Sequence, residues 1–401
     1  MGPNTLLPTS AERGKAMTSV HPSVACTTIV TEETGTTLGV EEEYHVVDAA
    51  TYELRHDAAL NSAAQHGTLG GTVHAEIATP VCRTLGEVRS ALELGRAQAA
   101  DAAATVGATI LPASIHPFAS WTDQRLTSRP RYLGMLERWG VLALQQVICG
   151  CHVHVGVPDL DTAVAVMDRA RPYLPTLLAL TGSSPFHEGV DTGYESFRTQ
   201  WWARWPTSGA TEPFGDAATY RAVVAGLQAA DVTDDASQLY WDVRPSLRYP
   251  TVEFRIGDVC TSLDDAVLHA ALARSLTRVL ARQALAGMPA PVVRPEHLRA
   301  ARWRAARYGV DGQLFDLSRH ELVDGPVAVS RLLTELRDDL EDRGEWDEVR
   351  DGARRVIARG TSAARQRTVL HRDGDAVAVA RMLVREGLAL TVHRNSTALS
   401  R

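Results

Sequence analysis

Three consecutive acids interrupt a run of residues that is otherwise typical of a β-strand. The run covers residues 39–48 and reads Gly-Val-Glu-Glu-Glu-Tyr-His-Val-Val-Asp. Alternate residues of a strand point to the same side, so Glu41, Glu43 and His45 are expected to share one face, while Glu42 lies on the other face among apolar residues. Like charges ~7 Å apart on a sheet repel each other unless a cation lies between them. The run therefore predicts a strand with one core face and one face that binds a divalent metal.

The same alternation recurs in three further segments, 72–77, 151–157 and 251–258, where apolar residues alternate with glutamate, histidine or arginine. If all four strands join one sheet in register, a single polar surface collects Glu41, Glu43, Glu76, His152, His154, Glu253 and Arg255. Carboxylates dominate this surface, which suits a hard divalent cation better than zinc. Cys149 and Cys151 are expected to be small core residues instead.

Each pattern has a simpler explanation when it is taken alone. An acidic strand face is usually solvated, and a His-x-His pair also occurs on surface strands. Glu253 and Arg255 alone would form an exposed ion pair worth ~0–1 kcal/mol. Four such strands in one chain make the metal-binding interpretation the stronger one.

The composition excludes several classes of protein. With 401 residues, 45% of them hydrophobic and 22% charged, the chain is an ordinary soluble globular protein. A net charge of −7 without a Lys/Arg tract argues against a nucleic-acid partner. No apolar run approaches the ~20 residues that cross a bilayer. Five mostly dispersed cysteines do not suggest a disulfide framework, so a cytoplasmic location is expected. P-loop, G-x-G-x-x-G and G-x-S-x-G motifs are missing from the sequence.

The coarse organisation favours an α+β fold. Helices are predicted over residues 84–107, 162–180 (with prolines that kink or split it), 262–285 and several stretches after 295. The strand-like segments do not alternate regularly with these helices, which favours a mainly antiparallel sheet. Residues 183–245 are expected to be rich in loops. We expect a disordered N-terminal tail over 1–34, a single catalytic domain over 35–392 and a polar tail over 393–401.

Several segments together resemble the glutamate–cysteine ligase type 2 family, and within it the YbdK-like carboxylate–amine ligases. The resemblance is carried by residues 39–44, 76–81, 149–156 and 251–258, and also by 182–185, 196–198, 205–209 and 303–309. These segments occur in consistent order from about residue 36 to residue 388, which makes the resemblance far more specific than any single motif.

The resemblance implies a fold related to the catalytic domain of glutamine synthetase. In that fold a curved, mainly antiparallel sheet forms a metal-lined funnel with helices outside. It also implies an ATP- and Mg²⁺-dependent ligase of the glutamate–cysteine type (EC 6.3.2.2). Such an enzyme joins the γ-carboxylate of glutamate to the amine of cysteine through an acyl phosphate. Its partners are then small molecules, and a homodimer is the family-level expectation.

The resemblance also assigns roles to individual residues. The Mg²⁺-binding positions are Glu41, Glu43, Glu76, His152 and Glu253, and the first two thereby also bind ATP. Arg255 takes the position that contacts the transferred phosphate, so it is the predicted catalytic residue together with Glu253. One acidic ligand of better-studied ligases has no counterpart here, because Thr68 or Leu69 falls at its place.

Substrate binding is less sharply predicted. Arg198, Arg244 and Arg248 are candidates for gripping substrate carboxylates through bidentate pairs, and a structural or surface role is equally consistent with each. Trp201, Trp202 and Trp205 either wall the substrate pocket or belong to the core. Three alternatives to the glutamate–cysteine reaction remain at this point. They are a ligase with another amine, a metal-dependent amide hydrolase that uses His152 and His154, and a binding protein without catalysis.

Overall fold

The structure, a computed structural model, describes residues 34–55, 74–123, 130–234 and 236–389, which all fall within one compact unit, Glu32–Arg401. Apart from Thr34, the tails expected over 1–34 and 393–401 lie outside the described residues, and so do Thr68 and Leu69. The domain limits at residues 35 and 392 stay a prediction. Among the described residues, no helix is both long and apolar enough to span a membrane.

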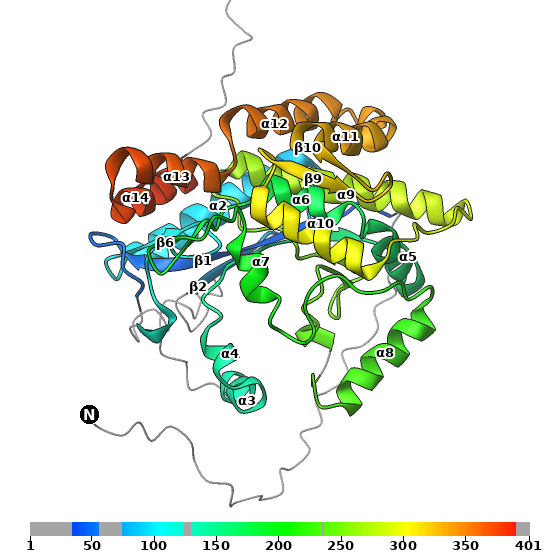
Figure 1. Ribbon diagram of the computed structural model, residues 1–401, viewed down its shortest axis with the longest axis horizontal. Coiled ribbons are helices and arrows are strands. Elements are labelled where there is room, and N and C mark those ends of the chain that lie inside the picture. The colour runs from blue at the N-terminus through cyan, green and yellow to red at the C-terminus, as the bar shows by residue number, and fades with distance from the viewer. Residues whose placement is uncertain (1–33, 56–73, 124–129, 235, 390–401) are drawn as a thin grey trace, which may run out of the picture. The chain divides into compact units, whose positions relative to one another are not determined.

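An open antiparallel sheet lies at the centre of this unit (Figure 1). Its strand order is β2 (His74–Ala78), β1 (Leu38–Asp48), β4 (Cys151–Gly156), β8 (Thr251–Phe254) and β7 (Val243–Pro245), with β3 (Ala108–Leu111) also paired to β1. Every pairing between these strands is antiparallel. The predicted α+β class and its mainly antiparallel sheet are therefore confirmed, and the four strand-like segments named above all contribute strands to this sheet.

Three long helices cover the apolar face of the sheet: α2 (Leu85–Ala104), α5 (Leu160–Ala170) and α9 (Leu263–Leu285). Residues Ala266 to Ala281 of α9 are buried without interruption, because α11 (Gly325–Asp342) and α12 (Trp346–Arg359) pack on its outer side. A helix that is buried all round lies in the middle of a layered core. The sheet, the α2–α5–α9 layer and the outer helices thus hold the strands in a fixed register.

The helix ends follow the sequence signals in most places. Thr84 caps α2 by accepting a hydrogen bond from the Glu87 amide at 3.1 Å, as its capping pattern predicts. The predicted helix over 162–180 is split, since α5 ends at Ala170 and α6 (Leu174–Thr181) begins after Pro172. Ser262 is the N-cap residue of α9, although its side chain makes no capping hydrogen bond.

The remaining elements surround the sheet and carry the loops of the site. They are η2 (Trp121–Asp123), α3 (Pro130–Trp139), α4 (Val141–Leu144), β5 (Phe186–His187), β6 (Val190–Asp191), α7 (Phe197–Trp202), α8 (Ala217–Ala229), η3 (Ala236–Gln238), α10 (Pro295–Tyr308), β9 (Gln313–Asp316), β10 (Glu321–Asp324), α13 (Ser362–Asp373) and α14 (Ala376–Gly387). The stretch expected to be rich in loops, 183–245, thus contains two α-helices, one short 3-10 helix and three short strands among its described residues. The hairpin of β9 and β10 interrupts the helices expected after residue 295.

Candidate functional site

The strand register places the predicted site residues in one row across the sheet. Glu76 of β2 lies opposite Glu43 of β1. Glu41 of β1 lies opposite His152 of β4, and His154 of β4 lies opposite Glu253 of β8. Neighbouring strands are only about 5 Å apart, so residues that pair across them bring their side chains together on one face.

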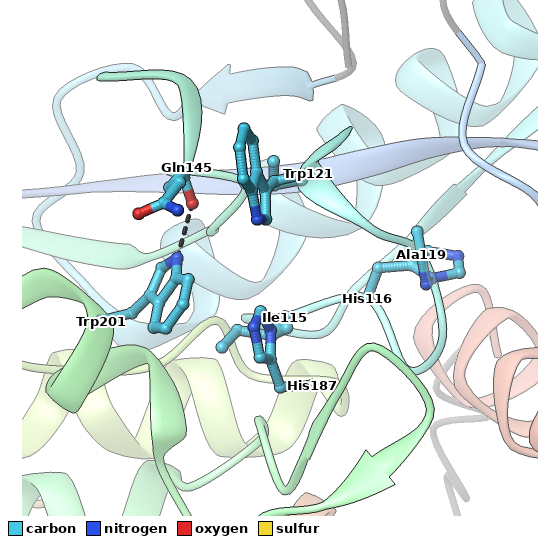
Figure 2. A pocket seen from close by; sticks show the side chains of 8 residues that line it. Ile115, His116, Ala119, Trp121, Gln145, His187 and Trp201 are labelled. Atoms are coloured by element: carbon cyan, nitrogen blue, oxygen red, sulfur yellow. Dashed lines mark hydrogen bonds between the residues drawn. The ribbon is translucent and has the colours of Figure 1, made fainter. Parts of the chain in front are cut away.

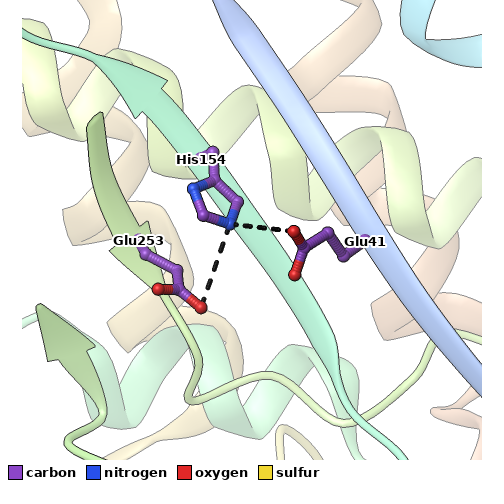
Figure 3. Close-up of side chains that lie close together, drawn as sticks. All are labelled: Glu41, His154 and Glu253. Carbon is purple, nitrogen blue, oxygen red and sulfur yellow. Dashed lines mark ion pairs between the residues drawn. The ribbon is translucent and has the colours of Figure 1, made fainter. Parts of the chain in front are cut away.

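Glu41, His154 and Glu253 form the tightest group of this row (Figure 3). The Nε2 atom of His154 lies 3.4 Å from Oε1 of Glu41 and 3.9 Å from Oε1 of Glu253. This Nε2 atom is buried and makes no hydrogen bond within the described residues. The other ring nitrogen, Nδ1, lies 2.9 Å from the hydroxyl of Thr251, which fixes the orientation of the ring. An imidazole nitrogen that faces two carboxylates is a donor set that fits a divalent cation.

His152 lies beside this group, with its Nδ1 atom 3.4 Å from Oε2 of Glu41. The structure thus brings His152 to the predicted face, where its role as a metal ligand stays a prediction. His154 was not among the predicted ligands, yet its ligand atom lies within 4.8 Å of those of Glu41 and Glu253. The sequence signal for it was the alternation itself, because residues 152 and 154 share one face of β4. Burial raises the pKa of Glu41, but the two imidazoles outweigh it and hold that pKa well below its usual range.

Glu253 is buried between two arginines. Nε of Arg244 donates to its Oε2 atom at 2.7 Å, and Nη1 of Arg255 donates to its Oε1 atom. Burial raises the pKa of Glu253, but the charges of Arg255 and Arg244 bring it well below the usual range. The Nε atom of Arg255 is buried and makes no hydrogen bond within the described residues. A fixed cation with an unused donor therefore lies at the edge of the acidic row.

Glu43 and Glu76 make up the other end of the row. Glu43 accepts a hydrogen bond from the amide of Gly150 at 2.7 Å. Glu76 is exposed to solvent on its strand, yet neighbouring protein groups partly desolvate its carboxyl group. This desolvation and the charges of Glu43 and Glu41 raise its pKa to about 7. Like charges that raise a carboxyl pKa in this way mark a surface with too few cations.

A glycine at position 150 is required by close packing beneath the row. A Cβ atom there would lie 2.5 Å from Nη2 of Arg198 and 3.0 Å from Nε2 of His152. Any larger residue would push one of these groups out of place. The Cys-Gly-Cys-His segment is explained by this contact, and the expectation that Cys149 and Cys151 are core residues is confirmed by their complete burial.

The three predicted substrate-binding arginines have different surroundings. Arg244 is buried and donates to the carbonyls of Ala236, Ser237 and Leu239 as well as to Glu253. Arg198 is also buried, lies 3.9 Å from a carboxylate oxygen of Asp258, and keeps an Nε atom without a partner within the described residues. Arg248 is exposed on the turn between β7 and β8. Arg198 and Arg248 thus retain donors for a ligand, whereas Arg244 is largely engaged within the protein.

Trp201, Trp202 and Trp205, the three candidate pocket tryptophans, also differ in their surroundings. The indole of Trp201 donates to the carbonyl of Gln145 at 2.6 Å and lines a small pocket with His187 and Trp121 (Figure 2). Trp202 and Trp205 pack against the ring of Tyr240 instead, with ring centroids 4.8 and 5.5 Å away. One of the three is therefore a pocket residue and two belong to an aromatic cluster.

Two residues of β1, Glu42 and His45, are not part of the row that a ligand can reach. Glu42 is fully buried on the opposite face and is paired with Arg96 of α2, as the alternation predicts. His45 lies on the expected face by alternation, but it is completely buried with its ring 5.9 Å from that of His116. The row that a ligand reaches on β1 thus includes Glu41 and Glu43 only.

Asp258 is a further buried residue that the sequence did not single out. Its carboxylate accepts hydrogen bonds from the Ser183 amide at 3.0 Å and from the hydroxyls of Ser184 and Ser196 at 2.7 and 2.8 Å. Ser196 is the N-cap of α7, the helix that carries Arg198. Asp258 therefore ties the start of α7 to the end of the β8 segment.

Comparison with known proteins agrees with this geometry. The family model of the glutamate–cysteine ligase family 2 (GCS2) matches residues 37–382. A protein of Frankia alni named "Putative glutamate–cysteine ligase 2-2" is 40% identical over 378 residues, covering 89% of this chain and 98% of its own. A similarly named protein of Salinispora arenicola is 43% identical over 350 residues, covering 84% of this chain and 91% of its own.

Solved structures show the same fold at low sequence identity. The glutamate–cysteine ligase of Francisella tularensis in complex with AMP superposes with a TM-score of 0.67 at 13% identity, over 88% of this chain and 89% of that one. The ligase PafA in complex with the ubiquitin-like protein Pup gives 0.52 at 12% identity, over 87% and 71%. The fold is that of the glutamine synthetase-like ligases, as the resemblance implied. From its sequence match over nearly the whole chain, the protein belongs to the glutamate–cysteine ligase family 2.

Proposed function

We propose that this protein is an ATP-dependent carboxylate–amine ligase that joins the γ-carboxylate of glutamate to the amine of cysteine. The observation that carries the proposal is the row of carboxylates and imidazoles that crosses four strands and ends at Arg255. Membership of the family supports it, as does the AMP bound to the Francisella relative. A cytoplasmic location, where ATP and amino acids are available, belongs to the same proposal.

The row fits Mg²⁺ by its chemistry. Glu41, Glu43, Glu76, His152 and Glu253 are the proposed ligands, and the unpartnered Nε2 atom of His154 adds a sixth donor close to two of them. When bound, Mg²⁺ would neutralise the phosphate oxygens of ATP and hold attacking and leaving oxygens in line.

Arg255 is the residue proposed to contact the transferred phosphate. Its guanidinium is anchored by Glu253, and its Nε–H stays without a partner within the described residues. Burial lowers the pKa of Arg255, but Glu253 and Glu43 raise it above its usual range, so the side chain stays charged. A charged donor held in place before the reaction stabilises the charge that develops on the phosphoryl oxygens.

The reaction then has two steps. The γ-carboxylate of glutamate attacks the terminal phosphorus of ATP, which forms an acyl phosphate and releases ADP. The amine of cysteine attacks the acyl carbon, forming the amide and releasing phosphate. Arg198 and Arg248, which keep N–H donors available for a ligand, are proposed to bind substrate carboxylates. Arg244 is buried and is proposed to orient Glu253.

A substrate-dependence assay tests the proposal. Purified protein with Mg²⁺ and ATP is expected to form ADP only when both glutamate and an amine are present, with the γ-glutamyl product identified by mass. Glu253→Gln should abolish turnover, whereas Glu335→Gln, which changes an exposed acid of α11, should not. Circular dichroism reports whether each variant is folded.

The outcomes distinguish the alternatives. ADP formation with glutamate and a different amine would replace cysteine but keep the ligase. Metal-dependent cleavage of an amide without ATP would replace the ligase by a hydrolase. Failure of every acid–amine pair to stimulate ADP formation would contradict the proposed reaction.

A further inference from the structure

A second cavity lies between α7, the loop that follows it and α10, and no residue of the acidic row lines it. Its volume is about 420 Å³, which is within the range of small-molecule sites. Two segments that carry the family resemblance, 205–209 and 303–309, contribute Ser208 and Trp303 to its wall. The proposed reaction assigns no role to either segment.

The cavity is lined by two arginines, and one of them is already paired with an acid behind the wall. Arg299 and Arg302 of α10 both line it, and none of its lining residues within the described chain is acidic. Arg302 pairs with the buried Asp242 through its Nε and Nη2 atoms, at 2.8 and 3.0 Å. The Nη1 atom of Arg302 takes part in neither contact and makes no other ion pair within the described residues. Arg299 forms no ion pair there and is exposed. Arg299 therefore brings a positive charge to the cavity that an anion would balance, and Arg302 adds a free donor edge beside it.

The rest of the wall supplies one polar group and an apolar surface. The hydroxyl of Thr211 is buried and makes no hydrogen bond within the described residues. Leu298 and Pro295 provide apolar contacts, and the indole of Trp303 is 41% exposed. A buried polar atom without a partner is costly unless a ligand or water satisfies it.

We propose that the cavity between α7 and α10 is a second ligand site, which binds a small organic acid with an apolar body. The carboxylate would pair with Arg299 and with the free Nη1 edge of Arg302, and the apolar body would lie against Leu298 and Trp303. Free amino acids fit less well, because their ammonium group would face two guanidinium groups and none of the described lining residues is acidic. The site is therefore distinct in its ligand from the amino-acid site proposed above.

Calorimetric titration of the full chain with phenylacetate tests this site, with phenylacetamide as the neutral isostere. Phenylacetate should bind with one-to-one stoichiometry, and the amide should bind at least about tenfold more weakly, since a charged hydrogen bond is lost. Arg299→Gln should weaken phenylacetate binding by about tenfold for the same reason. Arg304→Gln is the matched control, because Arg304 lies on α10 but donates to the Gln313 carbonyl outside the cavity.

Four results would overturn the proposal. They are the absence of heat of binding, equal affinity for acid and amide, equal weakening by the two arginine variants, and displacement of phenylacetate by glutamate. The last would place the probe at the amino-acid site. The titration needs no turnover, so its outcome is independent of the proposed ligase reaction.

Discussion

Glutamates on the two faces of β1 have opposite surroundings. On the core face, Glu42 is neutralised by Arg96, whose Nε and Nη2 donate to it at 3.0 and 2.6 Å, and by the hydroxyl of Tyr44. On the other face, Glu41 and Glu43 meet histidines and a further glutamate. The structural acid, Glu42, is thus paired with an arginine of the protein itself, Arg96. For Glu41 and Glu43 no arginine ion pair of this kind is present within the described residues.

The same contrast appears elsewhere in the core. Asp339 of α11 is buried, yet Arg278 of α9 pairs with it at 2.6 Å. Burial raises the pKa of Asp339, but Arg278 and its other partners bring it below the usual range, whereas the pKa of Glu76 is raised to about 7. Asp339 thus has its own arginine, whereas Glu76 faces two further glutamates.

The largest expected effect comes from removing charge on the open face. Glu41→Gln or Glu43→Gln should lower kcat by about a thousandfold or more, because charge stabilisation on the phosphoryl group is lost. The free energy of unfolding should stay about the same for Glu43→Gln, which relieves repulsion with Glu76, and should fall for Glu41→Gln, whose carboxylate loses its contacts with two imidazoles. Steady-state ADP formation and urea unfolding measure the two quantities. Loss of stability without loss of turnover would reverse the roles that we give the two faces.

Removing charge on the core face should act on stability instead. Glu42→Ala strands the guanidinium of Arg96 and should cost about 3–5 kcal/mol of unfolding free energy. The folded fraction should keep most of its turnover, and Glu42→Gln should impair turnover less than either open-face variant does. Combining Glu42→Leu with Arg96→Met should restore much of the stability, because an apolar pair replaces the ion pair. Equal loss of turnover in Glu41, Glu42 and Glu43 variants would contradict the alternation of the strand.

A buried histidine beside the covered end of β1 is also kept neutral. Burial lowers the pKa of His116 to about 4, although its contact with the Tyr52 carbonyl raises it slightly. Its Nδ1 atom accepts hydrogen bonds from the Phe118 and Ala119 amides, so protonation there would break both. The unfolded chain, with a histidine pKa near 6.5, binds the proton first as the pH falls.

Stability from His116 is therefore complete above about pH 6.5 and is lost as the pH falls toward 4, by on the order of 3 kcal/mol. Urea unfolding at pH 7.5 and pH 4.5 should show a larger drop for the native protein than for His116→Gln. Parallel drops in the two proteins would mean that His116 titrates normally.

The smallest expected effect lies at the rim of the open face. Arg248 is exposed, so Arg248→Gln should raise the KM for the acid substrate only about threefold, with kcat unchanged. Arg319→Gln, on an exposed turn far along the chain, serves as the comparison. A large fall in kcat would instead move Arg248 from the rim into the reacting part of the site.

Much of the site was predictable because a strand has a period of two. That period placed Glu41, Glu43, Glu76 and Glu253 on one face and Glu42 on the other, and the structure agrees. The helices capped by Thr84 and split near Pro172 followed from equally local rules. Local rules suffice where the signal lies within a few residues.

The rest depends on contacts between distant segments. The period could not decide between His152 and His154 as partner of Glu253, because strand pairing sets that choice. Nothing in the sequence around Arg244 indicates that this side chain donates hydrogen bonds to the carbonyls of Ala236, Ser237 and Leu239. Strand β7 was missed because it is short and ends in a proline, and His45 was placed on the site face although the segment around His116 covers it.

The pairing of β1 with β2 and β4 has a consequence for how this gene can change. One inserted or deleted codon within β1 would turn every following side chain to the opposite face. Glu43 would then enter the core without its own arginine, and a valine would replace a carboxylate in the row. A substitution along this strand thus affects one face at a time, whereas a change of length would damage folding and the candidate site in a single event.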